Sequence, residues 1–163
     1  MDLLWEELTL GLSDTRQLTR VLIRLLAATL LGAIVGFERE RAGKPAGLRT
    51  HTLVCLGTAV FVIVCSGVGM SLDAVSRVIQ GLVTGIGFIG AGTILKLDEQ
   101  LDVRGLTTAA GVWMTAAIGV SVGLGSIGVA TLSTVLAVII LAVVGALEGA
   151  AEKGKKDKRE QKT

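Results

Sequence analysis

The stretch GLTTAAGVWMTAAIGVSVGLGSIGVATLSTVLAVIILAVVGAL, residues 105–147, contains no Asp, Glu, Lys, Arg or His across its 43 positions. A helix of that length would be about 65 Å long, whereas about 20 apolar residues already cross the hydrocarbon core of a bilayer. The stretch therefore predicts two membrane spans with a turn between them. Glycines at 119, 123, 125 and 128 favour a turn in that part of the stretch.

Three more stretches have the same character. Residues 52–72 and 78–95 lack charged side chains altogether, and residues 21–37 contain one charge, Arg24. Charged residues make up 18% of the chain, below the roughly 25% of a soluble domain, and the mean hydropathy is +0.70. The sequence predicts an all-α integral membrane protein, a bundle of five transmembrane helices.

The flanking segments differ from this core. Residues 1–15 are predicted to be an N-terminal interfacial segment, acidic and without the basic region of a signal peptide. Residues 16–150 form the predicted transmembrane domain, and residues 151–163 a charged, disordered tail. Five spans place twelve Lys and Arg residues on the side of the C-terminus and four, Arg16, Arg20, Arg24 and Arg77, on the other. The positive-inside rule then predicts a cytoplasmic C-terminus and an N-terminus outside.

The glycines have two readings. Gly85-x-Gly87-x-x-Gly90 matches the loop that binds a dinucleotide, but it continues an uncharged span instead of following a strand. A cofactor loop there would leave backbone N–H groups unpaired in lipid, so we expect no cofactor. Glycines four residues apart allow membrane helices to approach closely. The predicted helix-packing residues are Gly32, Gly36, Gly81, Gly85, Gly119 and Gly123.

Polar residues gather around the segment 36–52. Anchoring at headgroups explains its Lys and Arg residues but not its interleaved Glu residues or the one His of the chain. Residues 47–50 and 105–108 open similar helices, which suggests two parallel helix hairpins plus one further helix. In that arrangement Glu38 pairs with Arg104 or Arg49, and Thr107 and Thr108 cap helices or line a pocket. The predicted polar functional cluster comprises Glu38, Arg39, Arg49, Thr50, His51, Arg104 and Thr107. His51 also fits an ordinary interfacial side chain, or a metal ligand without a second ligand nearby in sequence.

A second, extracytoplasmic cluster is predicted from Arg24, Asp73, Arg77 and Gln80. Asp73 and Arg77 stand four apart and suit a local ion pair. The alternative is that Arg24, a charge inside the membrane, pairs with Asp73. The sequence has no carboxylate cluster for Mg²⁺ or Ca²⁺ and no nucleophile beside a base. We therefore expect no metal site, no catalytic residue and no enzymatic activity.

The motifs GFERERAGKPAGLRTH, residues 36–51, and VRGLTTAA, residues 103–110, resemble the MgtC/SapB family of bacterial membrane proteins. The resemblance extends over residues 20–125. It implies about five transmembrane helices in the bacterial plasma membrane and a role under Mg²⁺ limitation, acid stress or growth inside host cells. It also implies modulation of other membrane machinery, such as the ATP synthase, more than Mg²⁺ pumping. Virulence-associated members carry a further soluble C-terminal domain, which we do not expect here.

Two functions follow from the residues and the resemblance. The first is a non-enzymatic regulator that contacts a membrane-protein partner or a second copy of itself within the bilayer. The alternative is a small ion or solute carrier or channel that works as a homo-oligomer, suggested by the intramembrane polar groups Arg24, Gln80 and Thr84. Neither function involves nucleic acid.

Overall fold

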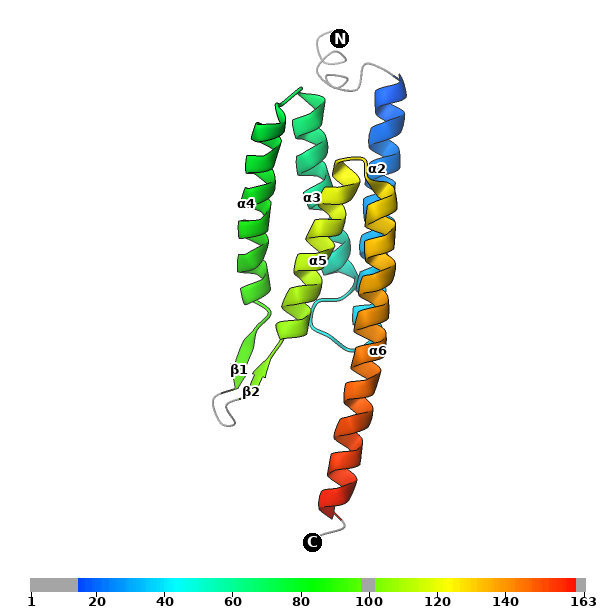
Figure 1. Ribbon diagram of the computed structural model, residues 1–163, viewed down its shortest axis with the longest axis vertical. Coiled ribbons are helices and arrows are strands. Elements are labelled where there is room, and N and C mark those ends of the chain that lie inside the picture. The colour runs from blue at the N-terminus through cyan, green and yellow to red at the C-terminus, as the bar shows by residue number, and fades with distance from the viewer. Residues whose placement is uncertain (1–14, 98–101, 161–163) are drawn as a thin grey trace.

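The computed structural model describes residues 15–97 and 102–160, in which five helices run up and down beside one another (Figure 1). They are α2 (Thr15–Arg41), α3 (Leu48–Gly67), α4 (Leu72–Ala91), α5 (Leu106–Gly123) and α6 (Ile127–Glu160). All five are long and apolar enough to cross a membrane, so the predicted all-α membrane bundle is confirmed. The turn between α5 and α6 falls among the glycines of residues 119–128. The predicted interfacial segment lies outside the described residues, except for Thr15, which begins α2.

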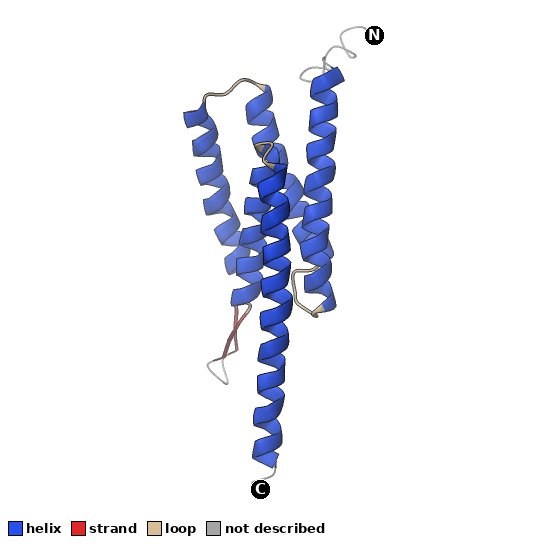
Figure 2. Ribbon diagram, turned by 45° about the vertical axis from the view of Figure 1, so that its right-hand side comes forward, coloured by secondary structure: helices blue, strands red, loops and turns tan. Residues whose placement is uncertain are grey.

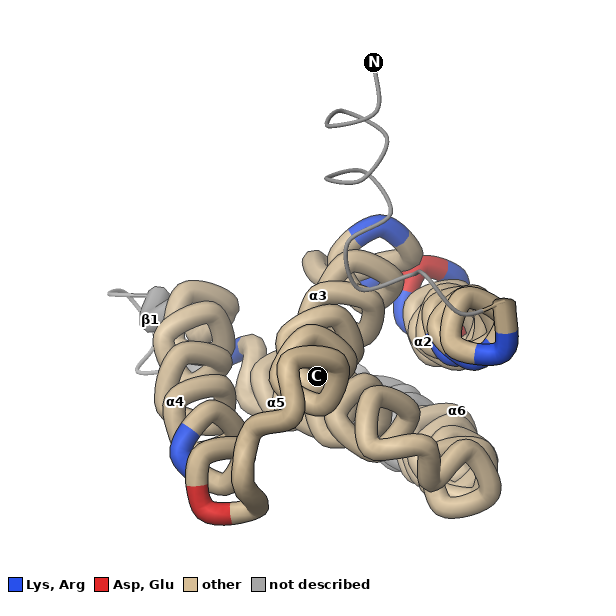
Figure 3. The backbone as a smooth tube through the Cα atoms, turned by 90° about the horizontal axis from the view of Figure 1, so that it is seen from above, with Lys and Arg blue, Asp and Glu red and all other residues tan. Residues whose placement is uncertain are grey.

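Helix α5 occupies the centre of the bundle. It contacts α2, α3, α4 and α6, and half of its most apolar 18-residue window is buried, compared with 17% for α4. Viewed along the bundle, α2 and α4 lie on opposite sides of α3 and α5 (Figure 3). Helix α4 packs mainly against α5, and most of its surface faces outward.

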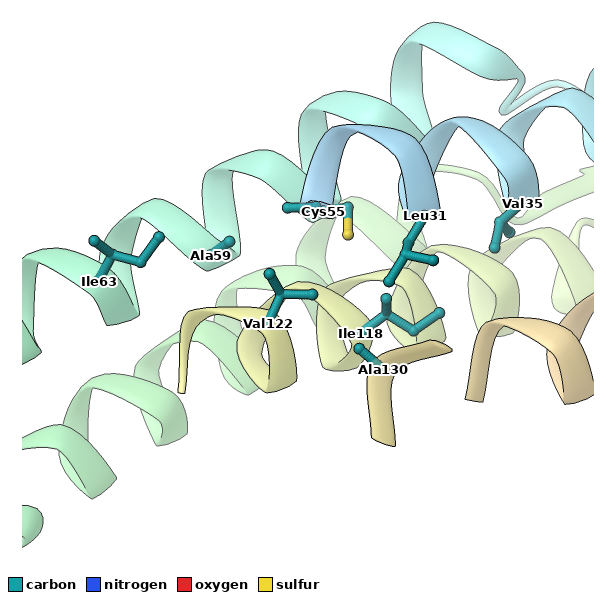
Figure 4. Close-up of a cluster of buried hydrophobic side chains, with 9 residues drawn as sticks. Leu31, Val35, Cys55, Ala59, Ile63, Ile118, Val122 and Ala130 are labelled. Atoms are coloured by element: carbon teal, nitrogen blue, oxygen red, sulfur yellow. The ribbon is translucent and has the colours of Figure 1, made fainter. Parts of the chain in front are cut away.

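The main core forms where α2, α3, α5 and α6 meet. Leu31 and Val35 from α2 lie against Cys55 from α3 and Ile118 and Val122 from α5 (Figure 4). Cys55 and Cys65 are both buried and free. Four of the nine buried side chains in this core, Ala28, Cys55, Ala59 and Ala130, are small, which allows the helices to come close.

Two pairs of glycines make this close packing possible. A Cβ at Gly32 would lie 2.7 Å from the Cβ of Cys55 and 2.8 Å from the carbonyl oxygen of His51. A Cβ at Gly36 would lie 2.7 Å from the Cα of Leu48. On α5, Gly119 and Gly123 approach α3 equally closely, next to Thr58 and Val62. Both α2 and α5 therefore pack backbone to backbone against α3.

The structure differs from the sequence analysis at Gly81 and Gly85. No atom lies within 4 Å of a Cβ built at either position, so neither glycine packs against another helix of the same chain. The spacing rule identifies glycines that permit close approach, but it does not say whether the approaching helix belongs to the same molecule.

The segment between α4 and α5 is a β-hairpin where the sequence analysis expected a short loop. Strand β1 (Leu95–Leu97) pairs antiparallel with β2 (Asp102–Arg104), and Leu95 lies opposite Arg104. Gly105 then starts α5 with φ = +98°, and a Cβ there would overlap the carbonyl of Thr93. Glycine is the residue that adopts this left-handed conformation without strain.

The charged C-terminal segment also differs from the prediction of disorder. Helix α6 continues through residues 151–160 and projects beyond the other helices (Figure 2). Ala, Glu, Lys and Arg, which dominate this segment, are strong helix formers, so the helix propagates although the segment has no apolar face. Composition alone had suggested a solvated chain.

The close approach of α2 to α3 predicts that Gly32→Ala is destabilising. The added methyl group meets Cys55 and the backbone of α3, and we expect the free energy of unfolding to fall by about 1–3 kcal/mol. Gly57→Ala on α3 is the matched control, because nothing lies within 4 Å of its Cβ position. Circular dichroism during unfolding by sodium dodecyl sulfate in mixed micelles measures both. Equal losses in the two variants would contradict the proposed packing.

Candidate functional site

A buried arginine is the most unusual feature of the bundle. Arg39, near the end of α2, is only 2% exposed. Its Nε and Nη2 atoms both donate to the carboxylate of Glu38, with Nη2 2.6 Å from Oε1, so the pair is bidentate. Nη2 also donates to the carbonyl of Leu141 on α6 at 3.1 Å.

These hydrogen bonds offset the free-energy cost of burying the Arg39 guanidinium away from water. An unpaired guanidinium away from water is strongly unfavourable, whereas a fork-shaped pair with extra hydrogen bonds is tolerated. A carbonyl oxygen has two lone pairs, so Leu141 can accept from Arg39 and still take part in its own helix. Arg39 and Leu141 are 102 residues apart in sequence, so their hydrogen bond forms a polar bridge between α2 and α6.

A polar cavity of about 270 Å³ lies beside this bridge, between the end of α2, the start of α5 and α6. It is lined by Glu38, Arg39, Ala42, Lys44, Thr107, Ile140, Leu141, Ala142, Val144, Gly145 and Ala146. The lining offers one carboxylate, two cations and a hydroxyl, which suits water or a small polar solute. Among the described residues, no three His, Cys, Asp or Glu side chains come together to hold a metal ion.

Glu40 has a structural role in the same segment. Its Oε2 atom accepts a hydrogen bond from the backbone N–H of Leu48, the first residue of α3, at 2.9 Å. The residue before that helix, Gly47, has no side chain to cap it, so Glu40 satisfies one of the free N–H groups from eight residues away. A Cβ at Gly47 would lie 2.9 Å from the same Oε2 atom, so the Glu40 side chain passes close to the start of α3.

His51 is completely buried between α3 and α5, so it is not the interfacial side chain that its position suggested. Its Nδ1 atom lies 2.7 Å from Oγ1 of Thr115, and that hydroxyl in turn donates to the carbonyl of Gly111 at 2.9 Å. Since the hydroxyl has one proton, Thr115 accepts from Nδ1–H of His51. The bond ties α3 to α5 in the interior.

The other ring nitrogen of His51 has no partner. Nε2 is buried and makes no hydrogen bond within 3.5 Å, although the backbone of Ala46 and the charges of Arg39 and Glu38 lie near the ring. With the proton on Nδ1, Nε2 presents a free lone pair. Buried polar atoms without a partner are rare, so this nitrogen is an unusual feature of the interior.

The remaining members of the predicted cluster are spread around this centre. Arg49 is exposed and Thr50 half-buried on the first turn of α3, and Arg104 is exposed at the end of β2. Glu38 pairs with Arg39, its neighbour in sequence, so the predicted pairing with Arg104 or Arg49 was wrong. Thr107 lines the polar cavity, which is one of the two roles suggested for it, and Thr108 is buried within α5.

The predicted extracytoplasmic cluster does not form. Arg24 donates through Nη1 to the carbonyl of Gly123, at the end of α5, at 2.9 Å. Asp73, Arg77 and Gln80 are exposed on α4, which lies across the bundle from α2, and no ion pair joins Asp73 to Arg77 in the described structure (Figure 3). Arg24 therefore bonds to a backbone carbonyl instead of Asp73, and Asp73 and Arg77 are exposed without an ion pair between them in the described structure.

Sequence reasoning missed two partners in the interior, Thr115 and the Leu141 carbonyl. Thr108 and Thr115 stand seven residues apart, so both lie on one face of α5, and both are buried. That spacing was a usable signal for a polar strip facing α3. A backbone carbonyl in mid-helix gives no such signal, because any residue type supplies it.

Replacing Arg39 is predicted to destabilise the bundle. Arg39→Met removes the cation and leaves the carboxylate of Glu38 without its partner. We expect the free energy of unfolding to fall by about 3 kcal/mol, at the low end for a broken buried pair because Glu38 is partly exposed. Arg49→Met, in an exposed position, should change it by less than about 0.5 kcal/mol. Detergent unfolding followed by circular dichroism measures both, and similar small changes would refute a structural role for the Arg39 bridge.

Comparisons with known proteins agree with this architecture. The chain is 48% identical over 113 residues to Protein SrpB of Synechococcus elongatus, covering 63% of this chain and 62% of SrpB. It is 46% identical over 115 residues to Protein MgtC of Salmonella typhimurium, covering 71% of this chain and 48% of MgtC. It is also 44% identical over 130 residues to the putative magnesium transporter YhiD of Escherichia coli K12, covering 75% and 59%.

The chain thus spans about half to three fifths of the length of these relatives. No solved structure matches it. The model of the MgtC family matches residues 25–150, which include most of α2, all of α3, α4 and α5, and α6 up to its projecting part. The protein is therefore a multi-pass membrane protein that belongs to the MgtC family.

Proposed function

We propose that this chain is a non-enzymatic regulator in the bacterial plasma membrane that acts by binding another membrane protein through the face formed by α3 and α4. Its biological setting is adaptation to low Mg²⁺ or to acid, as the family resemblance implies. The N-terminus lies outside and the C-terminus in the cytoplasm. The observation that carries the proposal is an open groove between the two helices.

The groove, of about 450 Å³, faces the lipid and is lined by apolar and small residues. Leu53, Val54, Gly57, Thr58 and Phe61 come from α3, and Gly81, Leu82, Gly85, Ile86 and Ile89 come from α4. At Gly57, Gly81 and Gly85 the Cβ position is empty to at least 4 Å. A helix from another protein can therefore approach the backbone of both α3 and α4.

The physics of the bilayer favours a protein occupant. Lipid tails are as apolar as leucine side chains, so membrane helices associate through close packing instead of hydrophobic burial. Glycines that pack α2 and α5 onto α3 within the chain have the same spacing as Gly81 and Gly85 on α4. Glycine pairs of this spacing thus occur inside the chain, where they pack helices, and also on the outer surface of α4.

The orientation rests on charge placement. The segment 42–47, the β-hairpin and the projecting end of α6 all lie at one end of the bundle (Figure 1). Of the 15 Lys and Arg residues in the part of the chain that the structure describes, 11 belong to this end or its flanking helix turns. An excess of Lys and Arg favours the cytoplasmic side.

Blocking the groove tests the proposal. A benzoyl-phenylalanine in place of Phe61 should photo-crosslink the partner in cells grown with low Mg²⁺, because Phe61 lines the groove and is 58% exposed. Gly85→Leu fills the groove, and we expect the crosslink yield to fall by about fivefold or more, equivalent to roughly 1 kcal/mol of binding.

Gly87→Leu is the matched control. Gly87 is on the same helix with an equally open Cβ position but does not line the groove, so its variant should crosslink normally. Mass spectrometry then identifies the product. Absence of any product, or a product made only of two copies of this chain, would refute regulation through a different partner.

A carrier is the second candidate, because one relative, YhiD, is named a putative magnesium transporter. The cavity beside Arg39 and the polar side chains of Gln80 and Thr84 would then belong to a path. The regulator proposal predicts no Mg²⁺, H⁺ or K⁺ flux into proteoliposomes above that of empty vesicles. A saturable flux that Thr107→Val abolishes, and that Thr131→Val on the exposed face of α6 leaves intact, would favour the carrier.

A further inference from the structure

Three arginines form a row at the start of α2. Arg16, Arg20 and Arg24 are spaced four residues apart and so lie above one another on the helix, where like charges repel. The first turn of α2 has no acidic residue to offset the positive end of the helix dipole. The row also lies at the end of the bundle opposite the one with most Lys and Arg residues. Repulsion between neighbouring guanidinium groups and the helix dipole both disfavour Arg20 and Arg24 at this end of α2 unless an anion balances them.

The row borders a polar cavity. A space of about 460 Å³ lies between α2 and the end of α3, lined by the three arginines together with Gln17, Ser66 and Gly67. In the part of the chain that the structure describes, no carboxylate lines this space. Its volume lies in the range of small-molecule pockets, about 300–1,000 Å³.

Arg24 and Arg20 differ in how their guanidinium groups are held within the cavity. Arg24 is partly buried and held by the carbonyl of Gly123, next to the turn between α5 and α6. Arg20, one helical turn closer to the start of α2, is exposed, and no described residue forms a hydrogen bond or ion pair with it. One guanidinium is therefore fixed in place and the other is available.

The height of the row matches the lipid headgroups. Helix α2 has 27 residues, about seven more than the hydrocarbon core requires, and charged residues at both of its ends suit the interfacial regions. Arg24 lies level with the end of α5, and Arg20 lies about 6 Å further out. A guanidinium presents N–H donors in a planar fork that fits two oxygens of a phosphate group.

We infer that this arginine pocket, formed by Arg16, Gln17, Arg20, Arg24, Ser66 and Gly67, binds a phosphate-bearing anion at headgroup height. Arg20 and Arg24 donate to the phosphate oxygens, and the Gln17 amide supplies a neutral donor. The phosphate group belongs either to the headgroup of an anionic lipid or to soluble phosphate. This site is separate from the Arg39 bridge and from the groove between α3 and α4.

Calorimetric titration of the full chain, stripped of lipid in dodecyl maltoside, tests the inference. The probes are dioctanoyl phosphatidylglycerol, dioctanoyl phosphatidylcholine and inorganic phosphate. We expect phosphatidylglycerol to bind at least about tenfold more tightly than phosphatidylcholine, and Arg20→Gln to weaken that binding by about tenfold. Arg77→Gln is the matched control: it removes an exposed arginine at the same end of the bundle, on α4, and should leave the affinity unchanged.

The outcomes separate the two sources of phosphate. Binding of phosphatidylglycerol without inorganic phosphate, dependent on Arg20, supports a lipid headgroup. Binding of inorganic phosphate with the same dependence supports a soluble ion. The inference is overturned if neither anion binds, or if Arg77→Gln weakens binding as much as Arg20→Gln. Because Arg20 is exposed, the variant should unfold at the same detergent concentration as wild type.

Discussion

The close contact of α2 and α5 with α3 is the constraint on which the rest of the structure depends. Inside a bilayer, removing apolar side chains from lipid contributes little, so the attraction between helices comes from close van der Waals contact. Gly32 and Gly36 on one helix, and Gly119 and Gly123 on another, allow that contact. Once both helices are in place, the side chain of His51 is enclosed and has to find its hydrogen bond inside the protein.

The polar side chains within the bundle follow a common rule. Arg24 binds the carbonyl of Gly123, Arg39 binds Glu38 and the carbonyl of Leu141, and His51 binds Thr115. The carbonyl of Gly123 is one of the last four of α5, which lack a donor within the helix and carry the negative end of its dipole. For Arg24, which has no carboxylate partner in the described structure, a backbone oxygen at the end of a helix thus accepts the hydrogen bond of the guanidinium.

The sequence was sufficient for the parts that repeat a physical rule over many residues. Long uncharged stretches predicted five spans. Glycine spacing predicted the faces of α2 and α5 that come into close contact with another helix. Individual partners were harder to predict. Glu38 pairs with its neighbour Arg39, not with Arg49 or Arg104 as the sequence analysis expected. Side chains one position apart on a helix normally diverge, whereas here the guanidinium of Arg39 bonds both to Glu38 and to the Leu141 carbonyl of α6. The hairpin at 95–104 and the helical end of α6 were missed because short or charged segments carry no hydrophobic period.

The continuity of α6 gives the bundle a mechanical property. The helix runs unbroken from Ile127 to Glu160, and about 20 of its 34 residues suffice to cross the membrane, so the remainder forms a rigid arm outside it. An α-helix resists twisting along its length, because every turn is bonded to the next. A rotation imposed on the arm is therefore delivered to Leu141, the point at which Arg39 connects α6 to the interior. The carbonyl of Leu141 thus links the helix that extends outside the membrane to the buried charge pair.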